Sequence, residues 1–257
     1  MILAVDMGNT NIVIGGIDKH TTYFVERMST VLHKTDLEYA VLIKTILDLH
    51  NVDPQTIEGA IISSVVPPLT NIIRASLYKV TGKNPLIVTS GMKTGLNILM
   101  DNPKTLGADL VVGSVAAMSM FQLPLIVIDM GTATTMCVVN QKAQYIGGII
   151  YPGLKVSLES LSGRTSQLPH ISLERPEKTI GKNTIDCMRS GIIYGNASMI
   201  DGMIDRMETE LGCHATVIAT GGLAQFITPY CLHKIHYVDD LLLKGLMVLY
   251  HMNTEDR

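Results

Sequence analysis

In two segments of this chain, an apolar run is followed by the same three residues, aspartate, methionine and glycine. The first segment is 2–10, with its aspartate at Asp6, and the second is 125–133, with Asp129 in the same register. Each apolar run predicts a buried strand that carries a carboxylate and a flexible turn to its exposed end. Such an end is suited to phosphate and metal binding. The repeat predicts two related halves with a cleft between them.

The first of these turns has the chemistry of a phosphate loop. Gly8 allows the backbone to approach a ligand closely, so the N–H groups of residues 8–11 and the Thr10 hydroxyl can surround phosphate oxygens. The Asp6 carboxylate would repel a bare phosphate, so Mg²⁺, or a water bound to it, must lie between them. An Asx-turn that caps a hairpin is the simpler alternative, and the in-register repeat favours the phosphate loop.

The second turn, 129–135, combines a glycine with several hydroxyl groups that we expect to donate to an anion. The hydroxyls belong to Thr132, Thr134 and Thr135. A threonine-rich turn without a ligand is the alternative. A third glycine turn, at 220–222, follows a predicted strand and would place a nucleoside or phosphate near a helix N-terminus. The chain has neither GxxxxGK[ST] nor GxGxxG, which disfavours P-loop and Rossmann nucleotide sites.

Asp109 is a further candidate for chemistry. It follows Gly107 and Ala108, between a loop rich in asparagine and proline (101–103) and an apolar stretch that predicts a helix. The carboxylate can be a helix N-terminal cap, worth about 1 kcal/mol, or a general base close to the cleft. The residues themselves leave both interpretations open.

The elements that position these residues follow the order βββαβα in both halves. Thr35 and Glu38 form a capping box that begins a helix running to about His50, and Pro67-Pro68 opens the next helix. The other predicted helices are a buried one after 109, a long one at 183–211, one after 222 and a last one at 241–252. The predicted strands are 2–5, 11–17, 21–25, 58–65, 86–89, 125–129, 134–140, 143–148 and 215–219. We therefore expect two domains, 1–115 and 116–257.

Composition excludes several function classes. The chain has 257 residues, 47% of them hydrophobic and 17% charged, with a net charge of −3 and no basic block, so nothing points to nucleic acid. Four scattered cysteines without a CxxC pair favour free thiols in a reducing cytoplasm. The histidines form no metal pattern, and we expect His233 and His236 at the surface.

We also expect neither a signal peptide nor a membrane span. The first strand begins at once, which leaves no room for a signal sequence. Residues 110–128 carry no charge and are long enough to cross a bilayer. They include Gln122 and Pro124, however, and end in the second Asp-Met-Gly strand, so a buried helix followed by a buried strand is the better interpretation.

Together the motifs resemble the ASKHA superfamily of acetate and sugar kinases, Hsp70 and actin, with its duplicated, ribonuclease H-like α/β halves. Within it, the ordered set of motifs along nearly the whole chain resembles the type III pantothenate kinases. The set comprises Asp101-Asn102-Pro103, Gly107-Ala108-Asp109, 147–153, Gln167-Leu168-Pro169, Gly181-Lys182-Asn183-Thr184, Ser190-Gly191, Thr220-Gly221-Gly222 and Lys244-Gly245-Leu246.

The resemblance implies ATP-dependent phosphorylation of the primary hydroxyl of pantothenate, the first step of coenzyme A synthesis, by a cytoplasmic homodimer. Asp109 would be the general base, Asp6 would hold Mg²⁺ through water, and Asp129 would bind a monovalent cation, K⁺ or NH₄⁺. The implied ATP-binding residues are Asp6, Met7, Gly8, Asn9, Thr10, Asn11, Ile12, Val13, Thr132 and Gly221. The implied substrate-binding residues are Met100, Gly107, Ala108, Asp109, Leu110 and Thr184.

Two positions depart from the family pattern. Leu110 stands where the family usually has arginine, and Met100 where it usually has tyrosine. An apolar side chain cannot replace a guanidinium at a carboxylate. The departures motivate a second hypothesis, a catalytically altered or non-catalytic relative that keeps the fold. A third hypothesis is another ASKHA kinase that acts on a different hydroxyl or acid.

Overall fold

The computed structural model describes residues 1–254, which form two compact units. Unit 1 comprises 1–96, 100–120 and the segment from 240 onward, and unit 2 comprises 97–99 and 121–239. The division differs from the predicted 1–115 and 116–257, because the last helix belongs to unit 1. Sequence order could not indicate this, since the helix packs on strands that lie more than half the chain away.

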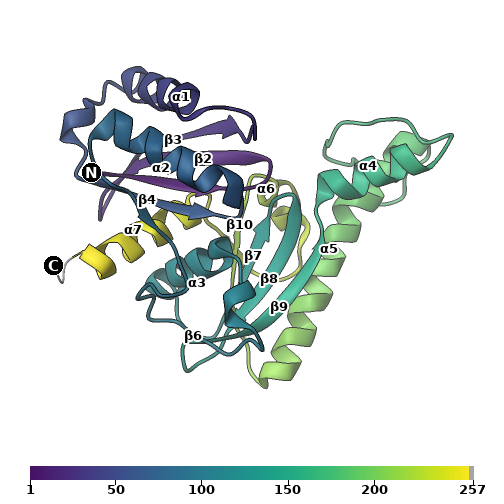
Figure 1. The fold of residues 1–257 in the computed structure, drawn as a ribbon. Helices are drawn as coiled ribbons and strands as arrows, with labels where there is room; N and C mark the ends of the chain where they lie inside the picture. Colours follow the sequence, from purple (N-terminus) through teal and green to yellow (C-terminus); the bar gives the residue numbers. More distant parts are fainter. Residues whose placement is uncertain (255–257) are drawn as a thin grey trace. The chain divides into compact units, whose positions relative to one another are not determined.

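Unit 1 is built on a five-stranded sheet with the order β3-β2-β1-β4-β5 (Figure 1). Its strands are β1 (Ile2–Met7), β2 (Asn11–Ile17), β3 (Thr22–Ser29), β4 (Gly59–Ser64) and β5 (Leu86–Ile87). The first three are antiparallel neighbours, whereas β4 and β5 run parallel to β1. In the β1–β4 pair, Asp6 lies opposite Ser63. The strand predicted at 86–89 is shorter in the structure, where β5 has two residues.

Helices cover both faces of this sheet. On one face, α1 (Asp36–Leu49) and α2 (Pro67–Thr81) form a common core with alternate residues of β1. These residues are Leu3, Val5 and Met7. On the other face, α7 (Leu241–Thr254) packs so closely that Leu243 and Tyr250 occupy the space above two strand glycines. The remaining helix, α3 (Ala108–Met120), packs on α7 and β4. The capping box at Thr35 and Glu38 is present as predicted.

Unit 2 contains a six-stranded sheet with the order β11-β10-β7-β8-β9-β6. The strands are β6 (Asn97–Ile98), β7 (Leu125–Met130), β8 (Ala133–Val139), β9 (Gln144–Pro152), β10 (Thr216–Thr220) and β11 (Ile235–Tyr237). The helices are α4 (Leu154–Arg164), α5 (Thr184–Leu211) and the short α6 (Ala224–Ile227). One apolar core joins α5 and α4 to alternate residues of β7 and β8. The β7–β8–β9 meander repeats β1–β2–β3, and β10 lies beside β7 as β4 lies beside β1.

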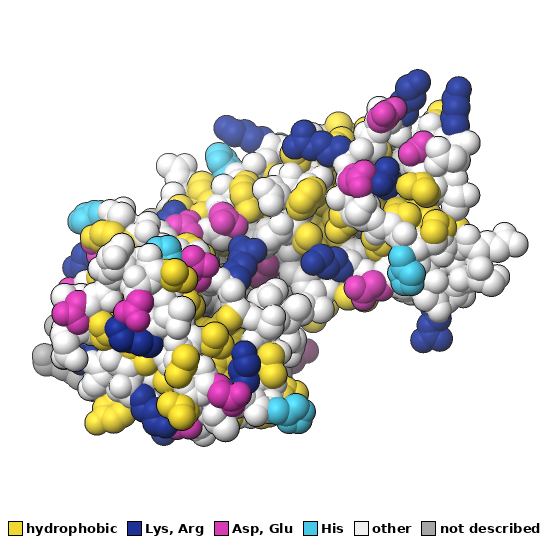
Figure 2. All heavy atoms as spheres, turned by 90° about the horizontal axis from the view of Figure 1, so that it is seen from above, with side chains coloured by type: hydrophobic (Ala, Val, Ile, Leu, Met, Phe, Trp, Pro, Cys, Tyr) yellow, Lys and Arg dark blue, Asp and Glu magenta, His cyan; other side chains and the backbone are white. Residues whose placement is uncertain are grey.

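The uncharged stretch at 110–128 divides as predicted, into α3 and β7. Within the described residues, no helix is long and apolar enough to cross a membrane. On the face shown in Figure 2, acidic and basic side chains of the described residues are interspersed rather than gathered by sign. The sequence did not indicate α4, β6 or β11, since β6 and β11 are only two or three residues long.

Candidate active site

The β1–β2 turn is held in a fixed shape by hydrogen bonds. The N–H of Gly8 donates to the Asn11 carbonyl at 3.0 Å, which closes the turn. Thr30, just after β3, holds it from outside, since its Oγ1 donates to the Gly8 carbonyl at 2.7 Å and its N–H donates to the Thr10 carbonyl at 3.0 Å. Thr30 was not singled out in the sequence, because nothing local marks a threonine 22 positions away as a partner of Gly8.

The segment 6–13 divides into side chains that can meet a ligand and side chains that cannot. Met7 and Ile12 are fully buried in the core beneath α1 and α2. Only the backbone of these two residues can contact a nucleotide. The side chains of Asn9, Thr10 and Asn11 are exposed, and Asp6 is half-buried on the face opposite Met7. The alternation of a strand decides this division.

Asp109 lies in the first turn of α3 with a half-buried carboxyl group. Its Oδ1 accepts a hydrogen bond from the N–H of Leu110 at 2.8 Å. A Cβ at position 107 would collide with this oxygen and approach Val65 to 3.8 Å, so the carboxyl sits where it does because position 107 is glycine. The nearness of Val65 to position 107 also places the start of α3 beside the end of β4.

Burial raises the pKa of the Asp109 carboxyl group above its ordinary value. The opposing contributions come from the backbone N–H groups of Leu110 and of Asp109 itself. No cationic side chain of the described residues contributes to the shift. A raised pKa makes a carboxylate a stronger proton acceptor. Met100, Ala108 and Leu110 are also half-buried.

Ser63, the partner of Asp6 in the β1–β4 register, is fully buried, and its hydroxyl has no hydrogen-bond partner within the described residues. Leaving a buried hydroxyl unpaired costs about 1–3 kcal/mol. Ser63 was not predicted as a site residue, because a serine at the end of an apolar strand gives no separate signal.

In unit 2, the turn after β10 lies against the end of β7. Thr220 is opposite Asp129 in the strand register. Gly221 has a φ of +92°, and a Cβ there would lie 2.7 Å from both Asp129 Oδ1 and the Met130 carbonyl oxygen. Two oxygens thus converge on a space that only glycine leaves open. Asp129 and Gly221, which were predicted from separate motifs, are brought together.

The β7–β8 turn is also closed by its glycine and is one residue tighter than the first turn, with the N–H of Gly131 donating to the Ala133 carbonyl at 3.0 Å. Gly153, the N-cap of α4, donates to the Thr132 carbonyl at 3.2 Å, and a Cβ there would collide with that oxygen. One prediction for this turn is wrong. Thr134 is fully buried on the core face of β8, so its hydroxyl cannot donate to a ligand at the turn. Thr132 is exposed.

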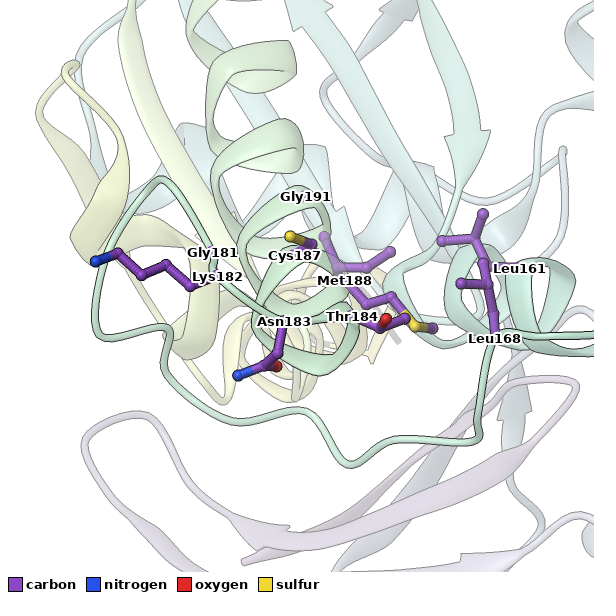
Figure 3. Close-up of a pocket in the computed structure, with 10 residues that line it drawn as sticks. Leu161, Leu168, Gly181, Lys182, Asn183, Thr184, Cys187, Met188 and Gly191 are labelled. Carbon is purple, nitrogen blue, oxygen red and sulfur yellow. The ribbon is translucent and has the colours of Figure 1, made fainter.

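Thr184, the first residue of α5, lines a cavity of about 790 Å³. Figure 3 shows Thr184 and Met188 on successive turns of α5, facing Leu161 of α4, whereas the Lys182 side chain extends away from them. Asn183 caps the helix by accepting the N–H of Asp186 at 2.9 Å. The cavity lies within unit 2 and its lining is largely apolar.

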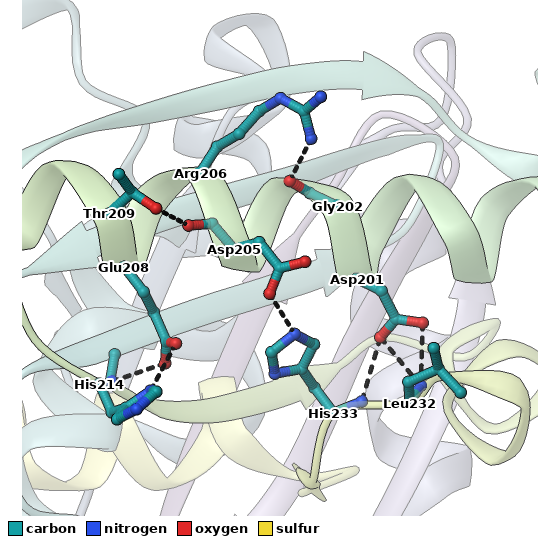
Figure 4. Close-up of polar contacts among 10 residues, drawn as sticks. Asp201, Gly202, Asp205, Arg206, Glu208, Thr209, His214, Leu232 and His233 are labelled. Atoms are coloured by element: carbon teal, nitrogen blue, oxygen red, sulfur yellow. Dashed lines mark hydrogen bonds and ion pairs between the residues drawn. The ribbon is translucent and has the colours of Figure 1, made fainter.

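Carboxylates on the second half of α5 form hydrogen bonds with the neighbouring loops (Figure 4). Asp201 accepts the N–H groups of Leu232 and His233 at 2.9–3.1 Å. His233 also lies 2.9 Å from Asp205, while His236 packs on Phe121 with ring centroids 5.2 Å apart. The two histidines, predicted at the surface, are therefore half-buried, since each is held by a partner.

The sequence pattern of the family described as "Type III pantothenate kinase" matches residues 2–206 of this chain. A protein of Halalkalibacterium halodurans with that name is 44% identical over 255 residues, which covers 99% of this chain and all of the relative. A protein of the same name from Exiguobacterium sp. is also 44% identical, over 99% of this chain and 100% of its own length. One from Bacillus cytotoxicus is 42% identical over 99% of this chain and 97% of its own length.

Solved structures with the same fold are far less similar in sequence. A putative Baf family transcriptional activator from Campylobacter jejuni has a TM-score of 0.63 at 18% identity, with 99% of this chain and 100% of that chain covered. Component A of the (R)-2-hydroxyglutaryl-CoA dehydratase of Acidaminococcus fermentans has a TM-score of 0.57 at 15% identity, over 100% and 99% of the two chains. A putative N-acetylglucosamine kinase from Porphyromonas gingivalis reaches 0.51 at 12% identity, over 99% and 100%. These likenesses confirm the predicted duplicated α/β fold.

Proposed function

The chain belongs to the type III pantothenate kinase family and phosphorylates pantothenate in coenzyme A biosynthesis, and on this premise we propose which of its residues perform each step. The observation that carries the proposal is the arrangement in unit 1, where Asp6, near the end of β1, and Asp109, at the start of α3, both lie at the same end of β4. The whole-chain relatives disfavour the non-catalytic alternative.

Asp6 and the β1–β2 turn bind the phosphates of Mg·ATP. The turn offers the N–H groups of residues 9–11 and the hydroxyl of Thr10, in a shape fixed by Thr30. The carboxylate of Asp6, at the end of β1, fits a metal ion held through water. The metal, when bound, neutralises phosphate charge, and the protein contributes positioning and hydrogen-bond donors. Met7, Ile12 and Val13 act through their backbone, since the first two side chains belong to the core.

Asp109 is the general base. A primary alcohol is a poor nucleophile at neutral pH, so a carboxylate that accepts its proton and orients it accelerates attack on the γ-phosphorus. The hydrogen bond from the N–H of Leu110 fixes one carboxyl oxygen of Asp109 and leaves the other to accept the proton. The raised pKa supports this role. Gly107 and Ala108 allow the substrate to approach the turn that carries the base.

The second turn holds the other ligands. Thr132 and Gly221 contact ATP, and Asp129 binds K⁺ or NH₄⁺. The support for a cation is that Asp129 Oδ1 and the Met130 carbonyl oxygen both point to the space beside Gly221, and potassium-sized cations are bound by such convergent oxygens. Replacing K⁺ by Na⁺ is expected to depress the rate. An unchanged rate would contradict the assignment of Asp129.

Pantothenate is held by Met100, Gly107, Ala108, Leu110 and Thr184. With leucine at position 110, no guanidinium from this position can pair with the substrate carboxylate. Binding then depends on hydrogen bonds, such as one from the Thr184 hydroxyl, and on apolar contact with Leu110 and Met100. We expect a KM for pantothenate that changes little with salt, because no strong ion pair forms at this position.

The enzyme acts as a homodimer in the cytoplasm. The support is a set of exposed apolar side chains in unit 2, among them Ile150 at 78% and Ile180 at 82% exposure. Large apolar side chains that form a contiguous exposed patch are typical of an interface. The thiols of Cys187, Cys213 and Cys231 form no disulfide bond, which suits a reducing compartment.

A coupled assay of ADP release with pantothenate, ATP, Mg²⁺ and K⁺ tests the activity. We expect turnover that depends on pantothenate. Intact ATP binding without turnover above background would favour the non-catalytic alternative. Turnover with another alcohol or acid, but not with pantothenate, would favour a different ASKHA kinase. Sedimentation at assay concentrations tests the dimer.

A further inference from the structure

Two adjacent serines end β4, and their hydroxyls differ in what they contact. Ser64 Oγ lies 2.8 Å from Thr70 Oγ1 and accepts the N–H of Val66 at 3.1 Å, so it fixes the start of α2. Ser63 Oγ contacts no hydrogen-bond partner within the described residues, although the side chain is fully buried. The fold therefore explains the hydroxyl of Ser64 but not that of Ser63. A buried unpaired polar group in a native protein calls for a reason.

Alternation along β4 places Ser63 on the face that carries the catalytic elements. Gly59 faces α7, since a Cβ there would collide with Tyr250, and Ser63 lies four residues further along the same side. The residues between, Ala60 and Ile62, face the core beneath α1 and α2. The start of α3, which carries Asp109, also packs at this end of β4. Ser63 thus shares a face and an end of the sheet with Asp109.

On β1, the strand neighbour of Ser63 is Asp6. The two residues are register partners in the parallel β1–β4 pair. Neighbouring strands are about 4.8 Å apart, and register partners project from the same face. A rotation about χ1 of Ser63 therefore brings its hydroxyl within hydrogen-bond reach of the Asp6 carboxylate. We propose that Ser63 is a positioning residue whose hydroxyl donates to the Asp6 carboxylate when Mg²⁺ and nucleotide are bound.

The inference rests on the proposed role of Asp6 as the carboxylate that holds Mg²⁺ through water. A carboxylate in that role must keep one oxygen directed at the water shell, and a donor on the other oxygen fixes this orientation. In this role Ser63 affects the binding of Mg²⁺. The affinity for nucleotide in the absence of Mg²⁺ does not depend on Ser63. A merely structural hydroxyl would instead contribute to stability and leave the metal dependence alone.

Ser63→Ala separates these roles. Binding of ADP, which permits no turnover, is measured by calorimetry over a series of Mg²⁺ concentrations and again with EDTA. We expect the variant to need about fivefold more Mg²⁺ for half-maximal tight binding, with the affinity in EDTA unchanged. Thermal unfolding without ligand is expected at the same or a higher temperature, because the substitution removes an unpaired buried hydroxyl. An unchanged Mg²⁺ requirement would overturn the inference.

Ser76→Ala is the matched control. Ser76 is equally buried, but its hydroxyl donates to the carbonyls of Asp36 and Ile72, both at 2.8 Å. The control is expected to unfold at a lower temperature with the wild-type Mg²⁺ requirement. If Ser63→Ala behaves like Ser76→Ala, its hydroxyl is structural and the proposal is wrong. If ADP binding to the wild type does not depend on Mg²⁺, the metal role of Asp6 fails, and the role of Ser63 with it.

Discussion

Position 221 must be glycine for Asp129 to keep its place, because a Cβ there would lie 2.7 Å from Asp129 Oδ1. The contact joins two turns that are more than 90 residues apart, 221 − 129 = 92. It also accounts for a glycine with φ at +92°, a backbone conformation in which alanine is strained.

Gly221→Ala is expected to lower the free energy of unfolding by about 1–3 kcal/mol, from backbone strain and displacement of the carboxylate. Because Asp129 is the proposed cation ligand, the K⁺ concentration for half-maximal activity is expected to rise. Chemical denaturation and K⁺ titration of the rate measure the two effects. Gly195→Ala is the control. Position 195 lies in α5 with open space at the Cβ, so alanine is expected to stabilise the helix by up to about 1 kcal/mol. A wild-type K⁺ requirement in Gly221→Ala would contradict the cation site.

Asp109→Asn is expected to lower kcat by at least about 10², because the amide cannot accept the proton. The raised pKa of Asp109 also determines whether the free energy of unfolding rises or falls with pH. A carboxyl whose folded pKa exceeds the unfolded one favours folding only while protonated, and this contribution is lost as pH rises through the folded pKa. The neutral variant is therefore expected to be as stable as the wild type, or more stable, at pH 7.

The pH dependence of kcat/KM tests the same residue. In the wild type, kcat/KM is expected to fall at acidic pH with a midpoint above the usual pKa of an aspartate. The base must be deprotonated to act, and burial raises its pKa. In Asp109→Asn this fall is expected to disappear from the residual rate. Wild-type turnover in the variant would remove Asp109 from the role of base.

Thr30→Val removes the hydroxyl that donates to the Gly8 carbonyl. Because that bond holds the phosphate turn, we expect the KM for ATP to rise by about three- to tenfold, with a smaller change in kcat. Steady-state kinetics with ATP as the varied substrate measure this. Thr45→Val is the control, since Thr45 is exposed on α1 and its hydroxyl donates to the Val41 carbonyl of its own helix at 2.8 Å. Equal kinetics in the two variants would show that the turn does not need Thr30.

Thr134→Val tests the correction made to the second turn. The Thr134 hydroxyl is fully buried and unpaired within the described residues. A methyl group of similar size is expected to raise the free energy of unfolding by about 1 kcal/mol, with the KM for ATP unchanged. Denaturant unfolding and ATP kinetics on one preparation decide the matter. A higher KM would return Thr134 to the ligand site.

Local patterns were enough to predict the framework. The apolar runs before Asp6 and Asp129 became β1 and β7, and the capping box at Thr35 began α1. Both signals are contained in a few neighbouring residues, and the chemistry of strand ends and helix caps is equally local. The Asp-Met-Gly repeat also indicated the duplicated fold, because related halves preserve the residues that end their central strands.

The amino-acid sequence by itself determined most of the elements, the repeat and the candidate carboxylates Asp6, Asp109 and Asp129. The tertiary structure decided which side chains accompany them. It separated Met7 from Asp6 by burying one face of β1, and it brought Thr30 to Gly8 and Gly221 to Asp129. The physical reason is the distance along the chain over which each kind of interaction acts. Propensity and periodicity act within a turn or a strand, whereas strand register and helix packing join residues whose separation along the chain leaves no local mark.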